Sequence, residues 1–382
     1  MQIIFIHLTF PGQFKHLISC LAEDKKNQIY FLATEAGPDC ALPGLTKIIV
    51  QKPEQGFCPQ AIGYGLAALP ALKKLKQQGV KPDLIYCHST WGLSFFVKDV
   101  FPDVPLISYF EWFYSHLNAD IFFTNKSITT EQAVEIRLNN ISILNDLLVC
   151  DAGITPTRWQ LIQFPPWFRS KLHQIHDGID TEFFKPGKRC LEFLNLDIPP
   201  DAPIITYTTR GFEPCRGFPQ FIKALQFLLV ENQNCHVVIA GNDNVYYGPQ
   251  RKDGRSWKEF MLERIQLDMA RVHFIEPMPY QLYVKLLQSS DVHLYLTKPY
   301  VLPWSILEAM SCGCVVVASD TEPVREVIKH GHNGFLTDLY DPVQIADSLQ
   351  RALELDGSIR QSISENARKT IMNHFSLPVV LP

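Results

Sequence analysis

Apolar residues occur along this chain mainly in short continuous runs, not in strict alternation with polar residues. The first half contains the runs Ile3–His7, Ile29–Ala33, Lys47–Val50, Leu84–Cys87 and Leu106–Phe110. The second half contains Ile204–Thr208, Val237–Ala240, Val272–Ile275, Val292–Leu296 and Val315–Ala318. Continuous runs of this length are typical of parallel strands that are covered on both faces. The pattern therefore predicts two parallel sheets.

Segments with apolar residues at three- and four-residue spacing lie between these runs, and this spacing is typical of amphipathic helices. The predicted helices are Gln13–Ala22, Ala67–Gln78, Thr130–Val149, Phe218–Glu231, Trp257–Ala270, Pro279–Ser289, Ser305–Ser311 and Val343–Glu354. Strands that alternate with helices indicate doubly wound α/β units. A turn-rich segment, His176–Arg189, separates the two sets. We therefore expect two facing Rossmann-like domains, residues 1–184 and 185–382, with a cleft between them.

The composition is that of a globular protein and argues against several classes of partner. The chain has 382 residues, of which 46% are hydrophobic and 19% charged, with a net charge of −4. Lysines and arginines are scattered, so no basic stripe is available to neutralise the phosphates of a nucleic acid. We therefore expect no nucleic-acid partner. The composition does not indicate an oligomeric state.

The cysteines and the N-terminus indicate a cytoplasmic protein. Six cysteines lie in apolar runs, where we expect small buried thiols in a reducing compartment: Cys20, Cys87, Cys150, Cys235, Cys312 and Cys314. No run of ~18 apolar residues predicts a membrane span, and MQIIFIHLTF reads as a first strand, not a leader. Membrane-surface contact by residues 164–171 with Lys73, Lys74 and Lys76 is a weaker alternative to buried aromatics and solvated lysines.

Metal chemistry finds little support in the sequence. Cys312-Gly-Cys314 and His173-x-x-His176 are each half of a ligand set, and no second half lies near either pair. The structural alternative, two buried thiols and two ordinary histidines, is favoured in both cases. We expect no metal and no cofactor.

Ligands of open parallel sheets bind at the carboxyl ends of the strands, and this rule selects three residues in the first half. Gly12 follows the first run, His88 follows the fourth, and Glu111 follows the fifth. Gly12 would allow a close approach to the donor or the acceptor, and His88 would face the cleft from its strand end. Glu111 would orient the acceptor or stabilise an oxocarbenium-like centre. The alternatives are an ordinary turn glycine for Gly12 and a structural histidine for His88.

The same rule selects an anion site in the second half. The first run leads into TRGFEPCRG with Arg210 and Arg216, and the second ends at Gly241 in AGND. A helix begins near Ser305 and Ile306, and its first N–H groups lack partners within the helix. Arginines beside a helix N-terminus suit a diphosphate. Neither GxGxxG nor a P-loop is present, so a dinucleotide site and an ATPase site are not indicated.

Glu308 has two interpretations. The spacing Ser305-x-x-Glu308 is that of a capping box, in which Glu308 would accept from the N–H of Ser305. Alternatively, the carboxylate would accept hydrogen bonds from the hydroxyl groups of a ribose. The spacing alone does not decide between them.

Six segments in order resemble the retaining glycosyltransferases of family 4, which are nucleotide-sugar enzymes of GT-B architecture. They are HDGIDTEFFKP (176–186), TRGFEPCRGF (209–218), VIAGND (238–243), SDVHLYLT (290–297), WSILEAMSCGCVVVASD (304–320) and VREVIKHGHNGFL (324–336). The first half matches more loosely, through Gly12, His88 and TPTRWQ (155–160). The resemblance is therefore specific over about half of the chain.

The resemblance implies a metal-independent, retaining transfer of a sugar from a nucleotide-diphosphate sugar to a hydroxyl of a small-molecule, glycan or lipid-linked acceptor. By motif position, Arg210 and Arg216 would bind the diphosphate and Glu308 the ribose. The family usually has lysine in place of Arg216, and its first motif glutamate is replaced here by Tyr300. We retain Tyr300, through its hydroxyl, and Gly241 as donor-binding candidates. Two alternatives are a non-catalytic nucleotide- or sugar-binding relative and a GT-B sugar epimerase.

Overall fold

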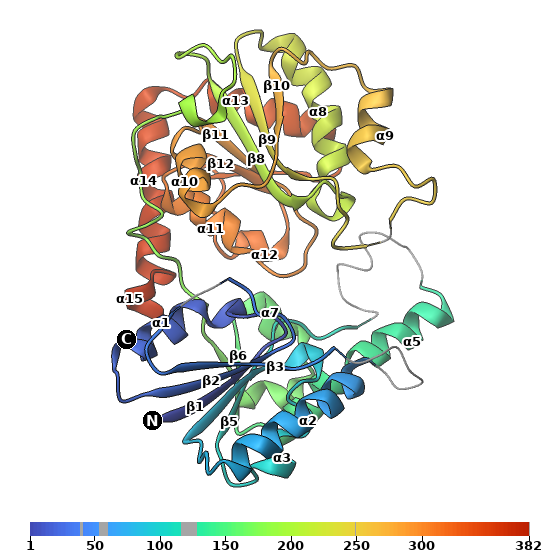
Figure 1. Ribbon diagram of the computed structural model, residues 1–382. Helices are drawn as coiled ribbons and strands as arrows, with labels where there is room; N and C mark the ends of the chain where they lie inside the picture. The colour runs from blue at the N-terminus through green and yellow to red at the C-terminus, as the bar shows by residue number, and fades with distance from the viewer. Residues whose placement is uncertain (39–40, 53–59, 116–127, 249, 382) are drawn as a thin grey trace. The chain divides into compact units, whose positions relative to one another are not determined.

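The computed structural model describes residues 1–38, 41–52, 60–115, 128–248 and 250–381. The chain divides into two compact units, one comprising Met1–Asp177 with Leu381 and the other Gly178–Val380. The division falls inside the turn-rich segment His176–Arg189. Each unit is built on a parallel sheet with helices on both faces (Figure 1), as the apolar runs predict.

The sheet of the first unit has seven strands in the order β3-β2-β1-β4-β5-β6-β7. The strands are β1 (Gln2–Ile6), β2 (Gln28–Ala33), β3 (Leu45–Ile49), β4 (Leu84–His88), β5 (Leu106–Tyr109), β6 (Ala152–Thr155) and β7 (Leu172–Gln174). The helices are α1 (Lys15–Glu23), α2 (Gln60–Gln77), α3 (Val97–Val100), α5 (Thr130–Asn139), α6 (Ile141–Val149) and α7 (Arg158–Gln163).

Alternate side chains of β1 explain why its sequence is apolar throughout. Ile4 and Ile6 pack in one core cluster with residues of α2, α3 and α6. Ile3 and Phe5 pack on the opposite face with residues of α1. Successive side chains of a strand point to opposite faces, so a strand covered twice needs apolar residues at every position.

The sheet of the second unit has six strands in the order β10-β9-β8-β11-β12-β13. The strands are β8 (Ile204–Gly211), β9 (His236–Asn242), β10 (Val272–Ile275), β11 (Val292–Tyr295), β12 (Val316–Ser319) and β13 (Phe335–Thr337). The helices are α8 (Phe218–Glu231), α9 (Trp257–Arg264), α10 (Tyr280–Gln288), α11 (Trp304–Ser311), α12 (Glu322–Arg325), α13 (Pro342–Leu353), α14 (Gly357–His374) and α15 (Leu377–Val380).

All ten predicted strands overlap observed strands, but the prediction omitted β6, β7 and β13. These three are short, and β7 is largely exposed, so none contains a long apolar run. The prediction also omitted α14, an 18-residue helix whose buried face consists only of Ile363, Ala367 and Ile371. So narrow an apolar stripe gives a weak helical signal.

The predicted single helix Thr130–Val149 is wrong, because two helices meet at Asn140. The side chain of Asn140 accepts from the N–H of Tyr114 at 3.0 Å and donates to its carbonyl at 2.6 Å. Apolar spacing cannot indicate such a contact between distant segments. The predicted helix Trp257–Ala270 also ends early, at Arg264.

Five of the six cysteines expected to be buried are buried, and none of these five is in a disulfide. Cys20 is exposed, because it lies on the outer face of α1. In the residues that the structure describes, no helix combines the length and hydrophobicity required to traverse a bilayer.

Candidate functional site

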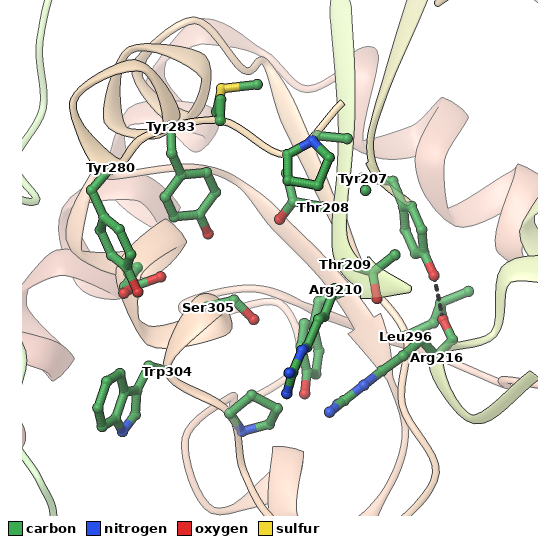
Figure 2. A pocket seen from close by; sticks show the side chains of 17 residues that line it. Tyr207, Thr208, Thr209, Arg210, Arg216, Tyr280, Tyr283, Leu296, Trp304 and Ser305 are labelled. Atoms are coloured by element: carbon green, nitrogen blue, oxygen red, sulfur yellow. Dashed lines mark hydrogen bonds between the residues drawn. The ribbon is translucent and has the colours of Figure 1, made fainter. Parts of the chain in front are cut away.

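A cavity of about 530 Å³ lies at the carboxyl ends of the central strands of the second sheet (Figure 2). The strand order reverses between β8 and β11, and this switch point is where open α/β sheets bind ligands. The cavity walls come from β8, the end of β9, the start of α10, the end of β11 and α11. The strand order alone therefore predicts a ligand site at the position of this cavity.

Arg210 and Arg216 both line this cavity, and Figure 2 shows their side chains converging on one part of it. Arg210 lies near the end of β8, and Arg216 lies on the short turn that leads into α8. Nη1 of Arg216 donates to the hydroxyl of Thr297 at 3.2 Å, and its carbonyl accepts from Tyr207 at 2.6 Å. Two fixed positive charges therefore face the same space.

The N-terminus of α11 forms another wall of the cavity. The helix begins at Trp304 after the N-cap Pro303, one residue earlier than predicted. Pro303 and Ser305 line the cavity, whereas the side chain of Ile306 is fully buried in the core. A contribution of Ile306 to ligand binding would therefore come from its backbone N–H, which is one of the first in the helix.

The capping-box interpretation of Glu308 is wrong, because Pro303 is the N-cap and Ser305 lies inside the helix. Glu308 lines the cavity with 4% of its surface exposed. The pKa of Tyr280 is raised to about 12, first by burial and then by the carboxylate of Glu308, to which the Tyr280 hydroxyl donates a hydrogen bond. Glu308 is thus an acceptor at the wall of the cavity, with Tyr280 beside it.

Gly241 and Tyr300, two other predicted donor residues, have different positions. Gly241 lines the cavity, and a Cβ there would lie 2.5 Å from the carbonyl oxygen of Thr209, so only glycine fits. Tyr300 is not among the lining residues. Its ring centroid lies 6.0 Å from that of Tyr247.

Several lining residues were not predicted from the sequence, namely Thr208, Tyr280, Tyr283 and Trp304. The buried hydroxyls of Thr208 and Tyr283 lie near each other but do not form a hydrogen bond of normal geometry. Figure 2 shows both at the cavity wall. Tyr280 and Tyr283 belong to α10, where their spacing is that of a helix core face, so neither residue could be recognised as part of a site from its position in the sequence.

Gly12 and His88 of the first unit lie at the switch point of its own sheet, between β1 and β4, and Glu111 follows the adjacent strand β5. His7 follows β1 and His88 ends β4, and their ring centroids lie 5.0 Å apart at an angle of 83°. Gly12 has a positive φ of 54°, and a Cβ there would lie 2.5 Å from the ring of His7. His7 was not predicted, although it ends an apolar run as His88 does.

Both histidines are neutral near pH 7. Burial lowers the pKa of His7, and burial with the neighbouring His7 lowers that of His88 well below its usual value. Nδ1 of His88 accepts weakly from the N–H of Thr90 at 3.4 Å, so the proton of the neutral ring is on Nε2. That Nε2 lies 3.9 Å from a carboxylate oxygen of Glu111. His88 can thus donate, and Glu111 can accept, at the carboxyl ends of the adjacent strands β4 and β5.

Across the described ranges, no group of three or more His, Cys, Asp or Glu side chains could hold a metal ion. The positive groups that face the cavity of the second unit are arginines and helix N–H groups. This arrangement can bind a polyanion and stabilise negative charge that develops on it.

Two family models match the chain in succession. Residues 26–184 match the model described as Glycosyl transferase family 4 group, and residues 192–370 match the one described as Glycosyl transferases group 1. Among curated proteins, the D-inositol 3-phosphate glycosyltransferase of Corynebacterium jeikeium is 26% identical over 85% of this chain and 77% of its own length. That of Acidothermus cellulolyticus is 24% identical over 48% of this chain and 41% of its own. The chain thus spans under half of some curated relatives.

Solved structures with the same fold cover essentially the whole chain. Anabaena Alr3699/HepE, solved in complex with UDP-glucose, has a TM-score of 0.73 at 16% identity and covers 100% of this chain and 97% of its own. The sucrose-phosphate synthase of Thermosynechococcus elongatus has a TM-score of 0.73 at 17% identity, covering 100% and 96%. At such identities the likeness concerns the fold.

Proposed function

The chain belongs to the group 1 and family 4 glycosyltransferases and has their GT-B fold, and we propose that it transfers a sugar from a nucleotide-diphosphate sugar to an acceptor hydroxyl. One observation carries this proposal: Arg210 and Arg216 converge with the N-terminus of α11 on one cavity. These groups suit a diphosphate. The Anabaena protein of the same fold was solved with UDP-glucose, so UDP-glucose is the first donor to test.

The proposed reaction retains the configuration of the sugar. The bond between the anomeric carbon and the diphosphate oxygen breaks, and the acceptor oxygen bonds to the same face. The proton of the acceptor hydroxyl passes to the departing diphosphate. Negative charge accumulates on that diphosphate in the transition state, and fixed guanidinium groups and helix N–H groups stabilise it without reorganising. The protein thereby supplies the positive charge itself, and we propose that no metal ion is required.

We propose that His88 and Glu111 of the first unit act on the sugar and the acceptor. The Nε2–H of neutral His88 is a donor suited to a sugar hydroxyl, and Glu111 is a carboxylate suited to orienting the acceptor hydroxyl. The acceptor itself is proposed only by class, as a small molecule, a glycan or a lipid-linked hydroxyl.

Turnover of a radiolabelled or isotopically labelled nucleotide sugar tests this function. We expect the protein to release nucleoside diphosphate from one of UDP-, GDP- or ADP-glucose, slowly by hydrolysis and faster with an acceptor. NMR of the early product is expected to show the anomeric configuration of the donor, and EDTA should leave the rate unchanged within about twofold. Inverted product would contradict the retaining mechanism, and loss of activity with EDTA that Mg²⁺ restores would contradict metal independence.

A non-catalytic nucleotide-binding protein is the second candidate, because Tyr300 replaces the first motif glutamate and does not line the cavity. The same assay separates the two functions. Binding of a nucleoside diphosphate without release from any nucleotide sugar, with a panel of sugar acceptors present, would favour the binding protein.

Glu308→Gln tests the proposed ribose contact. A neutral amide accepts more weakly than a carboxylate, and a hydrogen bond to a charged group contributes about 1.5–3 kcal/mol. We therefore expect the Kd for the nucleoside diphosphate to rise about tenfold. The matching 2′-deoxynucleotide should bind wild type and variant with more similar affinities. An equal loss for both nucleotides would assign Glu308 to the structure of the wall, where it contacts Tyr280.

A further inference from the structure

We propose that Glu213, Tyr246 and Tyr247 are positioning residues that orient the guanidinium groups of Arg210 and Arg216 for the diphosphate. This inference rests on the proposed function and extends it to two tyrosines outside the motifs that carry the family resemblance and to Glu213, which lies inside one of them but was assigned no role by it. None of the three lines the cavity, so they act through the arginines.

The two tyrosines lie on residues 243–248, which follow β9, and each ring lies over one arginine. The guanidinium carbon of Arg210 lies 4.0 Å from the ring centroid of Tyr246. That of Arg216 lies 5.3 Å from the ring centroid of Tyr247. A guanidinium that stacks on an aromatic face keeps its N–H edges available to a ligand while its rotation is restricted. The two ring contacts therefore hold the guanidinium groups of Arg210 and Arg216 toward the cavity that both arginines line.

Glu213 holds the backbone of both tyrosines in place. It is 1% exposed, and one carboxylate oxygen accepts from the backbone N–H of Tyr246 at 2.7 Å and of Tyr247 at 2.9 Å. Glu213 lies between the two arginines in sequence, in the turn between β8 and α8. A single buried carboxylate thus connects the segment that carries the rings to the turn that carries the cations.

Further contacts restrict the segment. The side chain of Asn242 donates to the phenol oxygen of Tyr246 at 3.0 Å. Gly211 allows a close approach, because a Cβ there would lie 2.3 Å from the carbonyl oxygen of Asn244 and 2.8 Å from the ring of Tyr246. The ring of Tyr300 packs near the ring of Tyr247. We infer that Tyr300, which replaces the family glutamate, supports Arg216 through this ring.

The test compares nucleoside diphosphate with nucleoside in paired variants. Titration calorimetry measures the Kd of UDP and of uridine, or of the pair whose base the wild-type protein selects. For Tyr247→Leu and Glu213→Ala we expect the diphosphate Kd to rise about five- to tenfold, as loss of a cation–π contact to a partly exposed ring predicts, and the nucleoside Kd to change less than about twofold. Tyr247→Phe and Glu213→Gln, which keep the ring and the acceptor oxygen, should stay within about threefold of wild type.

The outcomes separate this inference from the function on which it rests. If Arg216→Ala weakens diphosphate binding and Tyr247→Leu does not, the positioning role is wrong and the diphosphate site stands. If the diphosphate and the nucleoside lose affinity equally in Tyr247→Leu, the ring acts on the whole site and the inference is also wrong. If wild-type protein binds no nucleoside diphosphate, the proposed function itself fails. Should Glu213→Ala not fold, the Tyr247 pair decides alone.

Discussion

Replacing Arg216 by alanine is expected to lower kcat for sugar transfer by about 10²- to 10³-fold. Removal of one preorganised donor to a developing negative charge typically costs about 2.7–4 kcal/mol of transition-state stabilisation. Arg216 is largely enclosed, donates to Thr297 and faces the cavity with Arg210, so solvent screens its charge little. Steady-state kinetics with the nucleotide sugar selected above measures the effect.

Arg216→Lys is the matched variant, because the glycosyltransferases that the chain resembles usually have lysine at this position. The charge remains but the planar, two-pronged geometry is lost, so we expect a loss of about tenfold. If Arg216→Lys were as inactive as Arg216→Ala, geometry rather than charge would dominate. If Arg216→Ala kept more than half of wild-type kcat with an unchanged melting temperature, Arg216 would not stabilise the leaving diphosphate.

The second large effect concerns the stability of the first unit, not catalysis. Asp146 on α6 is fully buried, and its carboxylate accepts a hydrogen bond from the hydroxyl of Ser94 at 2.7 Å. Burial raises its pKa to about 7, although Ser94 and Asn145 act in the opposite direction. A carboxyl group with a raised pKa in the folded state binds a proton more tightly there than in the unfolded chain. The free energy of unfolding therefore falls as pH rises from about 4 to 7.

Asp146→Asn removes this titration and keeps the shape of the side chain. With one pKa unit equal to about 1.36 kcal/mol, we expect wild type to lose about 2–3 kcal/mol relative to the variant between pH 5 and pH 8. Urea unfolding of both proteins at each pH measures the difference, and the comparison cancels other titrating groups.

Asp151→Asn is the control for this prediction. Asp151 is largely exposed, and its hydrogen bond to Lys98 lowers its pKa, so it is already charged at pH 5. We expect its removal to change stability by less than about 1 kcal/mol, equally at pH 5 and pH 8. If Asp146→Asn and wild type showed the same pH dependence, Asp146 would titrate normally in the folded protein.

The sequence predicted the sheets well because parallel strands covered on both faces must be apolar at each position. β1 illustrates this, with Ile3 and Phe5 on one face and Ile4 and Ile6 on the other. It predicted the switch-point residues His88, Arg210 and Arg216 because topology assigns ligands to strand ends. It predicted β6, β7 and β13 poorly, because short strands, of which β7 is largely exposed, require few apolar residues.

The sequence by itself determined the α/β class and the family and predicted an anion site, since apolar runs and motif residues act through their immediate neighbours. Only the tertiary structure decided that Ser305 is not a cap, that Tyr300 packs on Tyr247, and that Glu213 connects Tyr246 and Tyr247 to the arginine turn. It alone shows that Asp146 is buried beside Ser94, 52 residues away in the chain. These contacts join segments distant in sequence, and neither spacing nor propensity encodes which distant groups meet.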